Sequence, residues 1–164
     1  MDIQAVGPIM KREEPPIVLD DLDARILRVL NRDARLSYRE IARELGVAIG
    51  TVSARIKRLE SSGIIHGYVP LLDQKRLGFD ILAVVGIKIS RGRLLEVQRR
   101  LAREERVFGV YDVTGEWDSI LMARFKNTRE LDAFIKRLAA TENVESTYTQ
   151  VVLNVVKHDL RVPV

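Results

Sequence analysis

The chain has 164 residues, of which 46% are hydrophobic and 30% are charged, with a formal net charge of +4. That length suits one moderate domain or two small ones, and the absence of cysteine excludes disulfide bonds, thiolate chemistry and cysteine-ligated zinc. No apolar run approaches the ~20 residues of a membrane helix, and the N-terminus lacks the apolar core of a secretory signal. We therefore expect a cytoplasmic protein whose mildly basic charge slightly favours a polyanionic partner.

The N-terminal segment and the first helix differ sharply in pattern. Residues 1–18 mix charges with three prolines and show no hydrophobic periodicity, which predicts a mobile arm. From Asp20 the chain carries aspartates, which favour the positive end of a helix dipole. Apolar residues then recur at helical spacing and form the stripe that this first helix buries: Leu22, Ile26, Val29 and Leu30.

Residues 37–63 predict two further short helices joined by a tight turn. Ser37 and Glu40 have the spacing of a capping box, in which each side chain accepts a hydrogen bond from a backbone N–H at the helix start. Gly46 has the conformational freedom that a left-handed helix end requires. With the helix before them, these two complete a three-helix domain over residues 19–63 that contains a helix-turn-helix.

The last of these helices has two contrasting faces. Its buried stripe consists of Val52, Ile56 and Leu59. Its outer face and flanks are small near the start and basic further along, and they carry Gly50, Ser53, Ala54, Lys57 and Arg58. Such a face suits a helix whose first turns enter a DNA major groove while its later turns meet phosphates. The competing interpretation is a solvated basic surface, which many helix pairs that never touch DNA also have.

Residues 64–80 are expected to form a strand and a hinge that link this domain to the second half. The segment at 64–72 is strand-like, so it either forms a small wing beside the helices or runs on as a linker. The segment at 73–80 is polar and contains Gly78, which is typical of a hinge between domains.

Residues 81–164 contain an internal duplication. A shift of 37 residues lays 100–102 on 137–139 and 83–87 on 120–124. The same shift pairs Glu105 with Glu142, Val107 with Val144 and Tyr111 with Tyr148. Each copy has the order strand, helix, strand, so together they predict a ferredoxin-like βαββαβ domain of the α+β class, with helices on one face of an antiparallel sheet. Because the strands are rich in Val, Ile and Leu, we expect a second subunit to cover the other face.

These blocks, in this order and spacing, resemble the Lrp/AsnC family of transcription regulators, also called feast/famine regulators. The resemblance covers residues 19–156 and rests on the helical domain, on LGF at 77–79, on TGEWD at 114–118 and on TYT at 147–149. It implies an N-terminal domain that binds double-stranded DNA and a C-terminal domain, from residue 81 to residue 164, that binds an effector and oligomerises. It further implies dimers paired through the C-terminal sheets, assembly into tetramers or octamers, and amino-acid ligands bound between dimers.

The last helix of the helix-turn-helix, which the resemblance makes the recognition helix, departs at its start from what is usual in this family. Ala48 stands where the family usually has Ser or Thr, so an N-cap bond worth ~1 kcal/mol is absent. Ile49 and Gly50 replace residues that are usually polar at the helix tip. Hydrogen bonds to bases are then left to Thr51 and Ser53, and we expect DNA shape and bending to carry much of the selectivity.

The later residues of the same helix are assigned to other parts of the DNA. Ala54 is expected near a thymine methyl group. Lys57 and Arg58 are expected to neutralise phosphates, with a solvated surface as the alternative. Arg55 lies near the buried edge of the helix, so packing along its aliphatic stem competes evenly with a phosphate contact.

The candidate effector residues lie in one turn and on two nearby elements. The turn carries Gly115, Glu116, Trp117 and Asp118, of which Glu116 stands where the family more often has Asp. An exposed tryptophan and two carboxylates at one tip suggest a site for an ammonium group, although a plain hairpin explains the glycine equally well. Thr147 and Thr149 place two hydroxyls on one face of the last strand, which β-propensity alone also explains. Lys136 is a further candidate for selecting the side chain of the ligand.

The sequence contains no nucleophile elbow, phosphate-binding loop or metal-binding motif, and His66 and His158 are isolated. We therefore predict neither an enzymatic activity nor a cofactor. Two other function classes compete with an effector-responsive regulator. An enzyme with a regulatory ferredoxin-like domain is disfavoured because catalytic residues are missing. An architectural protein that compacts DNA with low sequence preference is left open by the apolar tip of the recognition helix.

Overall fold

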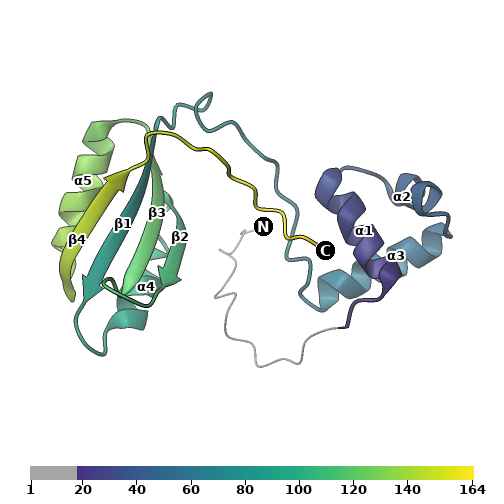
Figure 1. Cartoon of the computed structure of the whole chain (residues 1–164), viewed down its shortest axis with the longest axis horizontal. Helices are drawn as coiled ribbons and strands as arrows, with labels where there is room; N and C mark the ends of the chain where they lie inside the picture. Colours follow the sequence, from purple (N-terminus) through teal and green to yellow (C-terminus); the bar gives the residue numbers. More distant parts are fainter. Residues whose placement is uncertain (1–17) are drawn as a thin grey trace. The chain divides into compact units, whose positions relative to one another are not determined.

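The computed structural model describes residues 18–164, which form five helices and a four-stranded sheet (Figure 1). In chain order the elements are α1 (Asp21–Arg32), α2 (Tyr38–Leu45), α3 (Ile49–Ser61), β1 (Ile81–Ile89), α4 (Leu94–Leu101), β2 (Val107–Asp112), β3 (Ser119–Phe125), α5 (Thr128–Ala139) and β4 (Val144–Val151). The chain divides into two compact units. Residues 18–71 and 158–164 form the N-terminal unit, and residues 72–157 form the C-terminal unit. The predicted arm at 1–18 lies outside the described residues, apart from its last residue.

The helix ends of the N-terminal unit are fixed by local hydrogen bonds. At the start of α2 the Ser37 N–H donates to Glu40 Oε2 at 2.8 Å, and the Glu40 N–H donates to Ser37 Oγ at 3.3 Å. These two bonds confirm the predicted capping box. At the end of α2, Gly46 has a φ of 70°, which confirms the left-handed helix end.

The three helices of the N-terminal unit close around one apolar core. Its buried residues are Ile26, Val29, Ile41, Ala42, Val52, Ile56 and Leu59. The predicted stripe of α3 is therefore buried, and the helix-turn-helix is confirmed. Because α3 uses this stripe to pack on α1 and α2, its opposite side is left facing solvent.

The C-terminal tail belongs to the N-terminal unit. Arg28 Nε on α1 donates to the Val164 oxygen at 2.8 Å, and Asn31 Nδ2 donates to the Val162 oxygen at 3.0 Å. The sequence had assigned the whole of 81–164 to one domain, whereas residues 158–164 pack with the helices. The chain therefore passes between the two units twice.

The segment between the units contains no strand within residues 64–80, so the strand expected there is absent. The N–H groups of Ile64 and Ile65 both donate to the Leu59 oxygen at the end of α3, at 2.9 and 3.0 Å. The segment then runs on as a linker. The described part of this unit contains no strand with which it could pair, and an isolated strand is not stable. A turn follows, in which Gly78 adopts a φ of 81°.

The C-terminal unit is a four-stranded antiparallel sheet in the order β2-β3-β1-β4, which confirms the ferredoxin-like prediction. Alternate residues of β1 and β3 are buried together with residues of α4 and α5. The buried cluster consists of Ala83, Val85, Ile87, Ile89, Val97, Leu101, Leu121, Ala123, Phe125, Phe134 and Leu138. Both helices therefore cover the same face of the sheet. We call the other face, which carries Val84, Gly86, Tyr111, Ile120 and Tyr148, the open face.

The internal duplication is offset by one residue in its first strand. The shift of 37 residues lays Ala83, buried beneath the helices, on Ile120, whose side chain lies on the open face. The buried residues of β3 are instead Ser119, Leu121, Ala123 and Phe125, one step out of that alignment. Because successive strand residues point to opposite faces, this single-residue offset makes the predicted strand alignment wrong.

Candidate functional site

The outer side of α3 presents small residues first and a cation later. Ala48 makes no side-chain cap bond, and Ile49 is 47% exposed at the helix tip. Gly50, Ala54 and Lys57 are exposed, and Thr51 and Ser53 are half-buried. The Lys57 ammonium makes no ion pair with any described part of the chain. Gly50, Ala54 and Lys57 of the predicted DNA-binding residues are thus accessible to a partner, and Thr51 and Ser53 are partly so.

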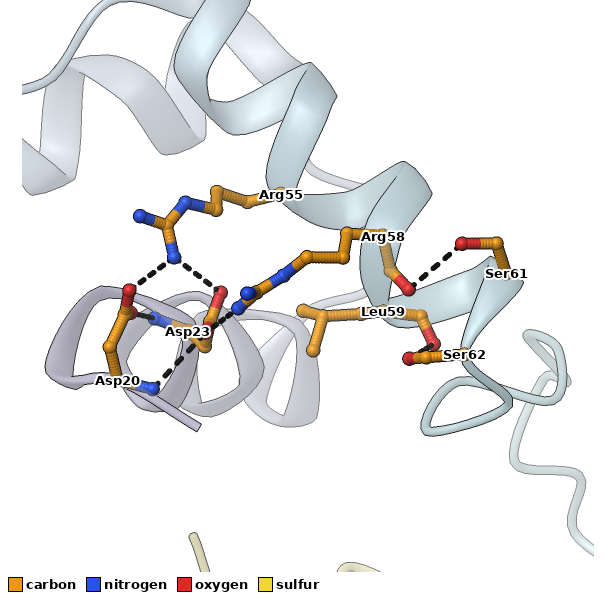
Figure 2. Close-up of polar contacts among 7 residues, drawn as sticks. All are labelled: Asp20, Asp23, Arg55, Arg58, Leu59, Ser61 and Ser62. Atoms are coloured by element: carbon orange, nitrogen blue, oxygen red, sulfur yellow. Dashed lines mark hydrogen bonds and ion pairs between the residues drawn. The ribbon is translucent and has the colours of Figure 1, made fainter. Parts of the chain in front are cut away.

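The two arginines of α3 have partners inside the unit (Figure 2). Arg55 Nη1 contacts the Asp20 carboxylate and lies 3.2 Å from Asp23 Oδ1, and Arg58 Nη2 contacts Asp23 Oδ2. Hydrogen bonds from the Asp23 backbone and then from Arg55 lower the pKa of Asp20. The same hydrogen bond, between the Arg55 guanidinium and the Asp20 carboxylate, raises the pKa of Arg55. In the sequence, these aspartates indicated only the start of a helix.

Two further cations on α2 were missed by the sequence analysis. Arg39 and Arg43 are exposed, lie four residues apart on one helix face, and make no ion pair with the described residues. In a helix-turn-helix the first helix crosses the DNA backbone. Their spacing on one face of α2 makes them candidate phosphate contacts beside those of α3.

The predicted effector turn is tied to the sheet by Asp118. The Ile89 N–H donates to Asp118 Oδ2 at 2.8 Å, and the Asp118 N–H donates to the Ile87 oxygen at 3.1 Å. Gly115 has a φ of 112°, a conformation that side chains rarely adopt. Glu116 is exposed. Asp118 therefore positions the turn through the sheet, whereas the Glu116 carboxylate is open to solvent.

Trp117 folds back over the open face of the sheet instead of standing free at the tip. Its ring lies so close to Gly86 that a Cβ there would sit 2.7 Å from Trp117 Cδ2. The ring stacks on Tyr148 with centroids 5.8 Å apart and an interplanar angle of 14°. A cavity of about 450 Å³ opens here and is lined by Val84, Gly86, Glu116, Trp117, Ile120, Tyr148 and Gln150. Trp117 is therefore half-buried, and the prediction that it is exposed at the tip of the turn is wrong.

The other predicted effector residues do not join this cavity within one chain. Thr147 and Thr149 pair with Ile87 and Val85, whose side chains face the helices, so the two hydroxyls lie on the covered side of β4. Lys136 is on α5 and bonds to Asp132 at 2.7 Å. Strand alternation brings Tyr148 and Gln150 to the cavity in place of the threonines.

The described residues contain no cluster of His, Cys, Asp or Glu placed to hold a metal ion. Nor does any helix over 18–164 have the length and apolar character needed to span a bilayer.

Both units match known families. Residues 19–66 match a winged helix-turn-helix DNA-binding family, and residues 82–162 match the Lrp/AsnC ligand binding domain. Together with the fold, these matches define a DNA-binding transcription regulator that carries a ligand-binding domain. The chain belongs to the Lrp/AsnC family.

Individual relatives agree with this membership along almost the whole chain. An HTH-type transcriptional regulator of Pyrococcus abyssi is 47% identical over 144 residues, which is 88% of this chain and 98% of the relative. The regulator FL11 of Pyrococcus furiosus is 37% identical over 147 residues, 90% of this chain and 97% of FL11. Among solved structures, a transcriptional regulator of Neisseria meningitidis in complex with L-Met has a TM-score of 0.83 at 26% identity, covering 89% of this chain and 97% of that one. These relatives are transcription regulators, and none indicates an enzyme family.

Proposed function

We propose that the protein is a sequence-selective regulator of transcription that binds double-stranded DNA and responds to an amino acid. The observation that carries DNA recognition is the accessible outer side of α3, where Gly50, Ser53 and Ala54 precede Lys57, a cation with no ion pair among residues 18–164. Small side chains let the helix approach base edges closely, and the cation then meets a phosphate. A regulator of this kind acts where the chromosome lies, so the proposal includes a cytoplasmic location.

The effector site in this proposal is the cavity beside Trp117. Glu116 offers an acceptor for an ammonium group, and the aromatic pair of Trp117 and Tyr148 offers an apolar wall. The L-Met complex of the neisserial relative supports an amino acid as the ligand class. Thr147, Thr149 and Lys136 fit the proposal only if a neighbouring subunit contributes them, because within one chain they lie on the helix-covered side.

Self-association completes the proposed mechanism. The open face bears apolar and aromatic side chains, with Tyr111 and Tyr148 about half exposed, and an uncovered sheet face of this kind favours a second copy. A ligand that binds better to one assembly shifts the population toward it, and the DNA affinity changes with the assembly. We therefore place a dimer, and tetramers or octamers built from it, in the proposal.

Selection of bound duplexes from a random pool tests this function directly. A sequence-selective regulator enriches one motif and prefers it over random duplex by ~10³ or more at matched salt. The selection is repeated with each amino acid, while calorimetry and light scattering record binding and assembly size. If no motif is enriched, the protein is not sequence-selective. If no amino acid binds or changes the assembly size, the proposed effector class is wrong.

One alternative has an observation of its own. Ile49 is exposed at the tip of α3, and Ala48 supplies no side-chain acceptor there. A tip with few hydrogen-bonding groups suits an architectural protein that compacts DNA with low sequence preference. The same selection experiment separates the two functions, since an architectural protein retains much of the pool.

A further inference from the structure

We infer that Arg55 and Arg58 position the recognition helix and do not themselves neutralise DNA phosphates. We call the group formed by Asp20, Asp23, Arg55 and Arg58 the α1–α3 clamp (Figure 2). The inference rests on the proposed DNA-binding function. It assigns a positioning role to Arg55 and Arg58 and leaves the phosphate contact of α3 to Lys57.

The centre of the clamp is the buried carboxylate of Asp23. This residue is 0% exposed, and a buried carboxylate is stable only when its oxygens have partners. Oδ1 lies 3.2 Å from Arg55 Nη1, while Oδ2 contacts Arg58 and also accepts from the Asp20 N–H at 3.2 Å. Removing either guanidinium leaves a buried acceptor short of a charged donor.

Asp20 extends the clamp to the first turn of α1. Its Oδ1 accepts from the Asp23 N–H at 2.9 Å, which closes a reciprocal capping box, and its Oδ2 contacts Arg55. Both carboxylates lie at the end of α1 where the helix dipole favours negative charge. The anchor that receives the two arginines is therefore itself held in place by the backbone of α1.

The spacing of the arginines turns this anchor into a constraint on α3. Arg55 and Arg58 are three residues apart and so share one face of the helix. Two guanidinium groups that meet one rigid pair of carboxylates oppose both rotation and sliding of α3 against α1. The apolar stripe of α3 leaves such small displacements less well determined, because apolar contacts have no direction. The residues that read bases lie on the same helix and move with it.

Charge accounting separates these arginines from Lys57. The four clamp side chains carry two positive and two negative charges, so a phosphate that approaches them meets no net attraction. The Arg55 side chain is 29% exposed and that of Arg58 47%, and their charged ends face the aspartates. Lys57 lies between them in sequence, yet it is exposed and makes no ion pair within the part of the chain that the structure describes. It is thus the matched control: a cation of the same helix without a carboxylate partner.

The test is the salt dependence of DNA binding, measured with the full-length chain and a duplex obtained by random-pool selection. For Lys57→Gln, the slope of log affinity against log salt falls by about 0.9 for each DNA-binding domain, because one phosphate contact is lost. For Arg58→Gln and Arg55→Gln, the slope stays at the wild-type value. Their preference for the selected duplex over random duplex falls by about tenfold, the loss that one mismatched base pair typically causes.

Three controls keep this result interpretable. For each variant, the concentration of DNA-binding protein is determined by stoichiometric titration with duplex, at a temperature below the melting temperature of every variant. A partly unfolded sample is then not mistaken for a weakly binding one. Arg58→Lys, which keeps a cation near Asp23, restores part of the lost preference. Asp23→Asn combined with Arg58→Gln lowers the preference by less than the sum of the two single changes, because both changes break the contact between Asp23 and Arg58.

Other outcomes overturn the inference in distinguishable ways. A slope that falls for Arg58→Gln as it does for Lys57→Gln means that Arg58 contacts a phosphate. An unchanged preference with only a lower melting temperature means that the clamp stabilises the fold without directing recognition. A wild-type chain that binds no duplex at any salt concentration removes the proposed function, and the inference with it.

Discussion

The N-terminal unit closes its core between three helices, whereas the C-terminal unit covers only one face of its sheet. In the N-terminal unit most arginines have ion-pair or hydrogen-bond partners within the same unit, including both arginines of α3. In the C-terminal unit Tyr111 and Tyr148 remain about half exposed on the open face. The two units therefore differ in how completely their own helices enclose the apolar core. The sheet of the C-terminal unit has no helices from residues 72–157 on its open face, and its apolar side chains there are ones that a second copy would bury.

Association of the C-terminal unit alone is the largest effect that this comparison predicts. A fragment of residues 72–157 should dimerise at micromolar concentration, which corresponds to about 8 kcal/mol of binding free energy. Tyr111→Asp should return it to a monomer. Leu95→Asp is the matched control, because Leu95 on α4 is 49% exposed and Tyr111 is 50% exposed. Sedimentation velocity distinguishes the states, and a stable monomeric wild-type fragment would break the comparison.

Loss of core packing in the N-terminal unit is the next largest effect. Ile56→Ala should lower the free energy of unfolding of this unit by about 2–5 kcal/mol, because the side chain is fully buried. The chain has one tryptophan, Trp117, and it lies in the C-terminal unit. In a denaturant titration, helical circular dichroism should therefore shift while the tryptophan fluorescence transition stays in place. Lys57→Ala, on the exposed side, should shift neither, and coincident shifts for Ile56→Ala would mean that the units unfold together.

A side chain at Gly86 should disturb the open face by a smaller amount. Gly86→Leu has to displace the Trp117 ring from its seat, and overpacking of this kind costs about 1–3 kcal/mol. We expect red-shifted tryptophan emission together with weaker self-association. Val84→Ile, two residues earlier on the same face, is the control. Unchanged emission and unchanged association would show that neither depends on how the ring is seated.

Acid should weaken the N-terminal unit by the smallest of these effects. Hydrogen bonds lower the pKa of Asp20, Asp33 and Glu40, all in this unit. A carboxyl whose folded pKa is lowered contributes stability above its ordinary value near 4, and this contribution is lost as the pH falls through the folded pKa. Asp20→Asn should therefore reduce the loss of helical stability below pH 4, measured by denaturation at several pH values. A variant with the same acid dependence as the wild type would contradict the assigned cause.

The sequence predicted the N-terminal unit well because its signals are local. The Ser37–Glu40 capping box, Gly46 and the stripe of α3 each depend on residues within two turns of one another. The clamp escaped prediction because Asp23 and Arg58 are 35 residues apart in the chain. No local periodicity indicates a pair of that separation.

In the C-terminal unit the element order was predictable and the faces were not. The repeated strand–helix–strand pattern indicated the ferredoxin-like fold. In the alignment of the two copies, however, the buried residues of β1 and β3 are one residue out of step, so it matches side chains on opposite faces of the sheet. The same alternation placed Tyr148, and not Thr147 or Thr149, beside the turn. The position of Trp117 over Gly86 depends on how the turn folds back, which residue types alone do not specify.

The C-terminal tail has a practical consequence for handling the molecule. Because residues 158–164 pack with the helices, a protease cut anywhere in 66–80 leaves the piece with α1–α3 held to the rest of the chain only by the non-covalent packing of this tail. A single nick would thus go unnoticed in native chromatography and appear only after denaturation. For the same reason, an affinity tag fused after Val164 would extend the chain at the group that Arg28 holds, so tags belong at the other end.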